Sequence, residues 1–131
     1  MEDFVPFKLA VKLEEKGFSC EYPFAMYNED GLFFPLYSSD KYYYGIEDFD
    51  KNDYIAPTIS QVLKWLRKEK KYHIEFVGNA CGYLFIISDI PSEGGTDRYC
   101  SDYSGPNDGG TWDKYEDCAL AGIKYVLDNL I

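Results

Sequence analysis

Histidine is almost absent from this chain, which has a single copy, His73, among 131 residues. Nucleophilic catalysis by a Ser/His/Asp or Cys/His arrangement would therefore have to use His73. That residue shares the polar positions of an expected strand with Glu75, which is typical of a surface histidine. A site that joins it to a cysteine would depend on tertiary proximity, which the sequence does not indicate. The sequence thus predicts no catalytic residues.

Closely spaced cysteines are also missing. The four cysteines lie at least eighteen positions apart, and none forms a C-x-x-C pair. Short spacings mark zinc and redox sites, so we expect no metal and no cofactor. The opening residues, Met-Glu-Asp, carry neither the basic nor the apolar segment of a signal peptide. We expect a cytoplasmic protein whose Cys20, Cys81, Cys100 and Cys118 are free thiols. Two disulfides are the alternative if a leader has been removed.

Long apolar runs and phosphate-binding loops are lacking as well. No apolar run approaches the ~18 residues that a spanning helix needs, so no membrane segment is predicted. The pairs Gly94-Gly95 and Gly109-Gly110 match neither G-x-x-x-x-G-K-[ST] nor G-x-G-x-x-G. Both pairs lie among acidic residues that would repel phosphate. Nucleotide binding is therefore not expected.

One acidic segment begins like a calcium-binding loop, with Asp48-x-Asp50-x-Asn52. A complete loop requires Gly at its sixth position and Glu at its twelfth. Asp53 and Ile59 stand at those positions, so the segment is not an EF-hand. A solvated acidic loop is expected. The alternative is an irregular calcium site built from Glu47, Asp48, Asp50 and Asp53.

Positive charge is outnumbered, with 13 Lys and Arg against 23 Asp and Glu, a formal net charge of −10. Residues 29–53 carry seven acids and two bases, and residues 89–117 carry eight acids and two bases. Residues 54–88 between them carry five bases and two acids. Such patterning bears on solubility and on the choice of partner, and it does not determine the fold.

Apolar and aromatic residues are abundant, at 46% and 18% of the chain, and thirteen of the aromatics are tyrosines. This composition is typical of an ordered globular protein. The length suits a single domain over residues 1–131, with enough chain to bury a core.

Helical periodicity appears in three segments. Residues 6–16 begin with Pro6 as a first helical residue and end before Gly17, where a Schellman motif would pack Phe18 on Leu13. Residues 58–71 open with a capping box, Thr58-Ile-Ser-Gln61. A third helix starts near Asp113, with Glu116 as its capping-box partner.

Strand patterns fill the spaces between these helices. An Asp-Gly turn joins runs at 23–27 and 32–37 into a hairpin. Residues 72–77 alternate apolar and polar, and residues 83–87 are apolar on both faces, as in a central strand. The segments 38–56 and 91–112 are expected to be long loops, with a short strand possible near 42–46.

The order α-ββ-α-ββ-α predicts an α+β domain with an antiparallel sheet packed by about three helices. Periodicity places seven side chains on inward faces. These are Leu63, Leu66, Phe76, Phe85, Ile87, Ile123 and Leu127.

Three segments carry a resemblance to other proteins: residues 56–67 (APTISQVLKWLR), residues 72–74 (YHI), and residues 115–127, with Tyr-Glu at the start and AGIKYVL at the end. They resemble a group of small uncharacterised proteins from gut bacteria and their phages or mobile elements. The resemblance implies a cytosolic, stand-alone accessory protein. It brings no known activity and assigns no site residues.

Three groups of residues form the candidate interaction surface: the aromatic Tyr42, Tyr43 and Tyr44; the acidic Asp48, Asp50 and Asp53; and the basic Lys64, Arg67, Lys68 and Lys71. The tyrosines suit binding at low entropic cost, or they cover the edge of the core. The basic residues recur at i, i+3, i+4 and i+7 on one helix face. Three interpretations of that face are open. It is solvated, it binds nucleic acid, or it contacts acidic surface in the same chain or in a symmetric dimer. We expect acidic surface, because the overall negative field opposes nucleic acid.

The sequence therefore predicts a non-enzymatic accessory protein that acts through contact with another protein, with a homodimer as one possibility. One version is an acidic inhibitor that mimics DNA. The alternative is a small-ligand or sugar-binding domain, or an unrecognised hydrolase, that uses the Tyr-rich segment 37–54 and the Gly-rich segment 91–112. A deep pocket lined by Tyr and carboxylates would favour the alternative, whereas a flat charged face would favour the protein partner.

Overall fold

The computed structural model of this chain describes residues 3–20, 23–36, 52–90, 97–100, 105–107 and 110–131, with the backbone alone for 97–100. The chain divides into two compact units, Met1–Val62 and Leu63–Ile131. The division falls within helix α2 (Ile59–Trp65). Each unit is described by itself, and the expected single domain over 1–131 stays a prediction.

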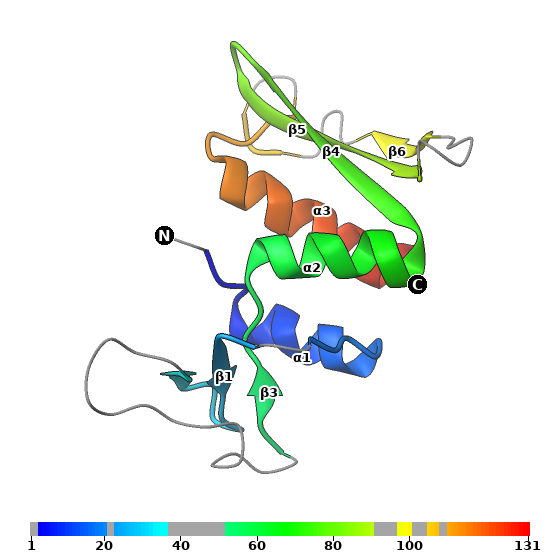
Figure 1. Cartoon of the computed structure of the whole chain (residues 1–131). Helices are drawn as coiled ribbons and strands as arrows, with labels where there is room; N and C mark the ends of the chain where they lie inside the picture. Colours follow the sequence, from blue (N-terminus) through cyan, green and yellow to red (C-terminus); the bar gives the residue numbers. More distant parts are fainter. Residues whose placement is uncertain (1–2, 21–22, 37–51, 91–96, 101–104, 108–109) are drawn as a thin grey trace. The chain divides into compact units, whose positions relative to one another are not determined.

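The first unit combines α1 (Phe7–Glu15) with strands β1 (Ala25–Tyr27), β2 (Phe33–Pro35) and β3 (Tyr54–Ile55) (Figure 1). Its described strands form an antiparallel sheet in the order β2-β1-β3. The expected β1–β2 hairpin is confirmed. The side-chain oxygen of Asn28 accepts the amides of Asp30 and Leu32 at 2.9 and 3.0 Å, which fixes the turn.

The capping predicted for α1 is confirmed at the end of the helix but not at its start. The amide of Phe18 donates to the carbonyl of Leu13 at 2.9 Å, and Gly17, at φ 87°, donates to Glu14 at 3.0 Å. These two bonds define a Schellman motif. At the start of α1, Pro6 is the N-cap and not the first helical residue as expected, because its ψ of 157° is extended.

The capping box at the start of α2 is also confirmed. The amide of Gln61 donates to the hydroxyl of Thr58 at 3.1 Å, and the amide of Thr58 donates to the side-chain oxygen of Gln61 at 3.0 Å. Two amides that the helix itself cannot satisfy are thus paired locally.

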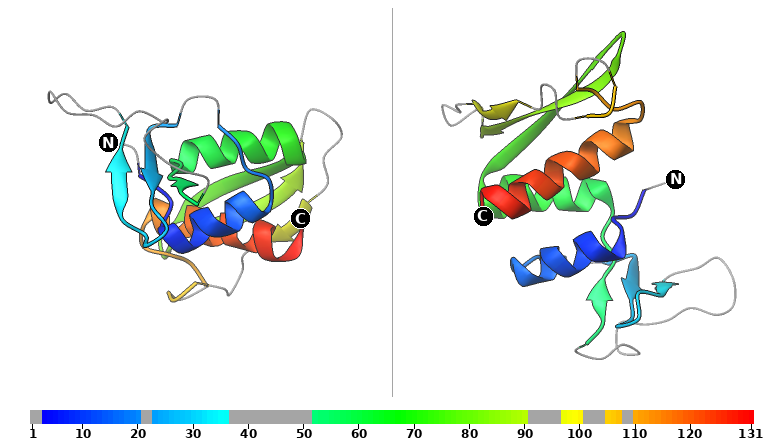
Figure 2. Two further views of the ribbon diagram at one scale, coloured as in Figure 1. Left: turned by 90° about the horizontal axis from the view of Figure 1, so that it is seen from below. Right: turned by 180° about the vertical axis from the view of Figure 1, so that it is seen from behind.

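The second unit begins with the end of α2, which continues as a π-helical segment, η2 (Leu66–Lys70). Strands β4 (Tyr72–Asn79), β5 (Gly82–Asp89) and β6 (Asp97–Cys100) follow in an antiparallel sheet, and α3 (Tyr115–Asn129) completes the unit. Helix α3 packs against β4 and β5, and the two views of Figure 2 show it running along one face of that hairpin.

Two strands lie where loops were expected. Strand β3 falls at the end of 38–56, and β6 lies inside 91–112. Both are short, and neither shows a local period-2 pattern. Strand β3 is held by pairing with β1, which is distant in sequence, and β6 is held by pairing with β5, the strand before it. The described strands also form two sheets where one was expected. The strand expected near 42–46 falls outside the described residues.

Helix α3 starts one residue later than expected, after Lys114, whose side chain makes no capping bond. The expected cap, Asp113, instead accepts a hydrogen bond from the side-chain amide of Asn107. Inside the helix, a Cβ on Gly122 would meet the ring of Phe85 and the side chain of Ile74 at 3.3 and 3.4 Å. Side chains, and not another backbone, therefore approach this glycine.

The fold class is α+β, as predicted, and most of the predicted core is buried. Of the seven expected core residues, Leu63 and Phe76 are half-buried and the other five are buried. No helix in the described ranges is long and apolar enough to cross a membrane.

Candidate interaction surfaces

Most of the predicted aromatic and acidic site lies outside the described residues, namely Tyr42, Tyr43, Tyr44, Asp48 and Asp50. Asp53 is described, half-buried, just before β3. It lines a hollow of about 70 Å³ together with Glu14 of α1 and the apolar Ala10, Phe18 and Ile55. Burial raises the pKa of Glu14 above its usual value. Small-molecule pockets usually span about 300–1,000 Å³, so this hollow is too small for such a ligand.

The predicted basic residues are all exposed, but the structure changes their spacing. Lys64 lies in α2, whereas Arg67 and Lys68 lie in the π turn, which departs from the 3.6-residue period. Lys71 follows the helix in the left-handed conformation, at φ 63° and ψ 34°. The expected single α-helical face is thus interrupted before Lys71. None of the four forms an ion pair with a described residue, and the acidic surface expected opposite them stays a prediction.

His73 lies half-buried in β4, opposite Ser88 of β5, and its strand neighbour Glu75 is exposed. No cysteine, serine or carboxylate in the described part of the chain hydrogen-bonds its side chain. Within the same ranges, no three His, Cys, Asp or Glu side chains gather as metal ligands would. The described residues thus supply no nucleophile–base pair around this histidine.

The described cysteines differ strongly in their surroundings. Cys20 is half-buried, Cys81 is exposed and Cys118 is buried in α3, and all three are free thiols. Burial raises the pKa of Cys118 to about 11. Its reactive thiolate is therefore scarce at neutral pH.

We expect four thiols when the denatured protein is titrated without reductant. In the folded protein, we expect the individual thiols to react with a thiol reagent at unequal rates. Cys81 should react fast with a thiol reagent, and Cys118 should react only as the protein opens, because it is both buried and protonated. Timed alkylation with peptide mapping measures both rates. A count of zero thiols, or equal rates at Cys81 and Cys118, would contradict this prediction.

The sequence interpretation missed an exposed apolar surface on the β1–β2 hairpin. Phe24, Leu32 and Phe33 are 48%, 58% and 43% exposed. They belong to the hairpin formed by β1 and the edge strand β2, in which Tyr27 is paired with Phe33. The signal was present in the apolar run at 32–36 (LFFPL), which was interpreted only as a strand. The register Tyr27↔Phe33 and the alternation of side chains along a strand place Phe33 on the face of Tyr27, and Phe24 on the opposite face. We call Phe24, Leu32 and Phe33 the hairpin patch, which therefore includes both faces of the hairpin.

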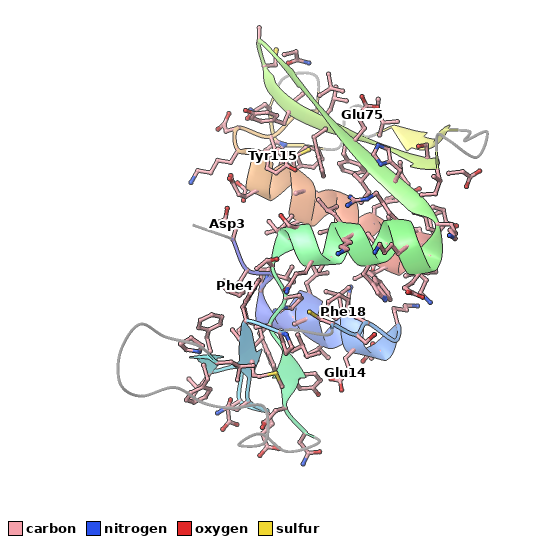
Figure 3. All side chains as sticks on the ribbon, viewed as in Figure 1. Asp3, Phe4, Glu14, Phe18, Glu75 and Tyr115 are labelled. Atoms are coloured by element: carbon pink, nitrogen blue, oxygen red, sulfur yellow. The ribbon has the colours of Figure 1, made fainter. Side chains whose placement is uncertain are left out.

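Aromatic contacts fix Phe33 on its face of the hairpin. The ring of Phe33 stands edge-on to Phe4, which is labelled in Figure 3, and to Tyr27, with centroids 5.0 and 5.7 Å away. The Tyr27 hydroxyl in turn donates to the carbonyl of Val5 at 2.6 Å. Phe33 is therefore held in place although nearly half of it is exposed. Glu29 and Asp30, both exposed, follow β1 at the hairpin turn and give the patch an acidic rim.

The second unit holds a shallow hollow of about 210 Å³ between α3 and β5. Phe85 and Ala121 line it, together with Trp112 and Tyr125, which are both half-buried. Its polar rim includes Lys124, whose ammonium donates to Asp128 at 2.7 Å. Trp112 is positioned by backbone hydrogen bonds with Tyr83 of 2.7 and 3.0 Å. We call this feature the α3 hollow.

Comparison of the chain with protein-family models, with curated proteins and with solved structures gave no match. The resemblance to proteins of gut bacteria and phages therefore stays an expectation drawn from the sequence.

Proposed function

We propose that this protein works by binding another protein through the hairpin patch. The observation that carries the proposal is the exposure of Phe33 on the edge strand β2, with Phe24 and Leu32 exposed elsewhere on the same hairpin. Single exposed apolar residues are common on protein surfaces, and what distinguishes Phe33 is that its ring is both exposed and fixed. Phe33 in particular is a rigid aromatic anchor, because Phe4 and Tyr27 already fix its ring.

The charge around the patch indicates what kind of partner it fits. Interfaces combine an apolar centre with a polar rim, and here the rim is acidic through Glu29 and Asp30. The net charge of −10 would attract a basic partner over long range. A partner with an apolar site surrounded by Lys and Arg suits both features. An inhibitor that occupies the basic face of a nucleic-acid enzyme is the narrower form of this proposal.

A photo-crosslinking amino acid placed at position 32 tests the proposal in the native host. Position 80, in the exposed turn between β4 and β5, is the matched control site. We expect a discrete crosslinked protein from position 32 and none from position 80. The same adduct should disappear when Phe33→Asp is added, because a carboxylate replaces the anchor ring.

Binding of the purified partner to the purified protein then gives the affinity. Phe33→Asp should weaken binding by about tenfold or more, since anchor residues in interfaces often contribute 2 kcal/mol or more. Adding salt should slow association if the acidic rim steers a basic partner. Equal adducts from positions 32 and 80, or no effect of Phe33→Asp, would contradict the proposal.

The α3 hollow supports a second candidate function, the binding of a small neutral ligand with a flat or ring-shaped apolar face. Trp112 and Tyr125 offer ring surface, and the Lys124–Asp128 pair leaves the rim without net charge. A sugar unit has that chemistry. Titration with simple sugars, followed by the nuclear magnetic resonance signal of the Trp112 indole, tests it, with Trp112→Phe as the control. If the Trp112 signal does not shift at high sugar concentration, this candidate function is excluded.

A further inference from the structure

Strand β4 forms one edge of the second unit's sheet and is long for an edge. It runs for eight residues, Tyr72–Asn79, and pairs on one side with β5. No described residue supplies a backbone hydrogen bond to its other side. Every second residue of an antiparallel strand directs its N–H and C=O away from the neighbour on a given side. Among the described residues, the donors and acceptors along the outer edge of β4 therefore have no backbone partner.

Proteins usually protect such an edge, because it is a template for pairing with another strand. The common devices are proline, lysine, a bulge or a very short strand. β4 contains neither proline nor lysine, and its register with β5 is continuous from Tyr72↔Asp89 to Asn79↔Gly82. Glu75 is its single acidic residue, and Val77 on the same face is 38% exposed.

The sequence of β4 complements itself in one register. In an antiparallel pair of two copies, residues directly opposite lie on the same face of the sheet. If the two-fold axis passes at Ile74, His73 of each copy stands opposite Glu75 of the other. A neutral or charged imidazole can donate an N–H to a carboxylate, so both pairs are favourable.

The same register also matches the other face. It places Tyr72 opposite Phe76 of the second copy, and aromatic cross-strand pairs stabilise sheets. An axis at Glu75 would instead bring two carboxylates together. No other axis position places Glu75 opposite His73, so charge complementarity selects the axis at Ile74.

From this self-complementary edge we infer that a second copy of this chain pairs antiparallel with β4 and continues the sheet across a two-fold axis at Ile74. The inference goes beyond the proposed function, because it concerns another surface and another partner. It would join two β4-β5-β6 sheets edge to edge.

Charge reversal and its rescue test this pairing on the full chain by sedimentation velocity, from micromolar to millimolar protein. The parent should form a concentration-dependent dimer. His73→Glu places two pairs of carboxylates face to face, so we expect the dimer dissociation constant to rise about tenfold or more. His73→Glu with Glu75→Lys restores opposite charges in both pairs and should restore the dimer. Asp117→Lys, on the exposed side of α3, makes the same charge change as Glu75→Lys and should leave the dimer unchanged.

Amide hydrogen exchange on the same samples shows where the copies meet. Every second amide between Tyr72 and Phe76 should gain protection as the protein is concentrated, because only the outward amides acquire new acceptors. Circular dichroism of each variant confirms that it is folded. A monomer at every concentration, or a dimer that His73→Glu leaves unchanged, would overturn the inference. So would a weakened dimer that the double variant fails to restore.

Discussion

Replacing Leu66 with alanine should lower the free energy of unfolding by about 2–5 kcal/mol. Leu66 is fully buried at the first position of η2. Truncation removes the transfer free energy of three carbon atoms and leaves a cavity. The π turn allows little collapse into that cavity, because the left-handed Lys71 closes the turn with a hydrogen bond to the carbonyl of Leu66.

Urea unfolding, followed by circular dichroism, measures this loss. Leu63→Ala is the matched control, since Leu63 lies one turn earlier and is only half-buried. Its truncation should cost clearly less, because apolar stabilisation scales with the area removed from water. If the two substitutions cost the same, Leu66 does not hold the core position that the structure gives it.

The parts of the fold that the sequence predicted well are those fixed by neighbours in the chain. The Schellman motif needs only Leu13, Gly17 and Phe18, and the capping box needs only Thr58 and Gln61. The hairpin turns have the same local origin. Each of these features satisfies its own backbone groups within a few residues, so a single sequence carries the whole signal.

The parts that the sequence did not predict depend on distant partners. The two residues of β3 become a strand because Tyr54 and Ile55 pair with Tyr27 and Met26. The π turn at Leu66–Lys70 has no propensity signal, because its residues are good α-helix formers. The amide of Lys71 donates to the carbonyl of Leu66, five residues back, which is the bond pattern of a π turn.

The candidate surfaces show the same limit. Helical spacing placed Lys64, Arg67, Lys68 and Lys71 on one helix face. All four are exposed, but the spacing did not predict the turn that interrupts their face. The exposed Phe33 was missed because an apolar run predicts burial, and exposure of an edge strand depends on what the rest of the chain covers. The edge of β4 was missed for another reason. Its N–H and C=O groups have no partner among the described residues, and such backbone groups leave no trace in the pattern of side chains.

Replacing Gly82 with alanine should destabilise the protein by more than about 2 kcal/mol. Gly82 closes the β4–β5 turn at φ 136°, a conformation that side chains rarely allow. A Cβ there would also fall on the backbone of Trp112, within 2.9 Å of its carbonyl carbon and 3.1 Å of the Thr111 hydroxyl. Neither a carbonyl in a bridge nor a buried threonine can move aside freely.

The clash should open the backbone bridge between Tyr83 and Trp112, whose two hydrogen bonds position the indole over the α3 hollow. Gly78→Ala is the matched control, since its new methyl would touch only the ring of Tyr83 at an ordinary 3.4 Å. Thermal unfolding should separate the two variants, and the near-ultraviolet circular dichroism of Trp112 should weaken in Gly82→Ala alone. Equal stability of the two variants, with the Trp112 signal unchanged in both, would show that the turn tolerates a side chain and that the bridge does not hold Trp112.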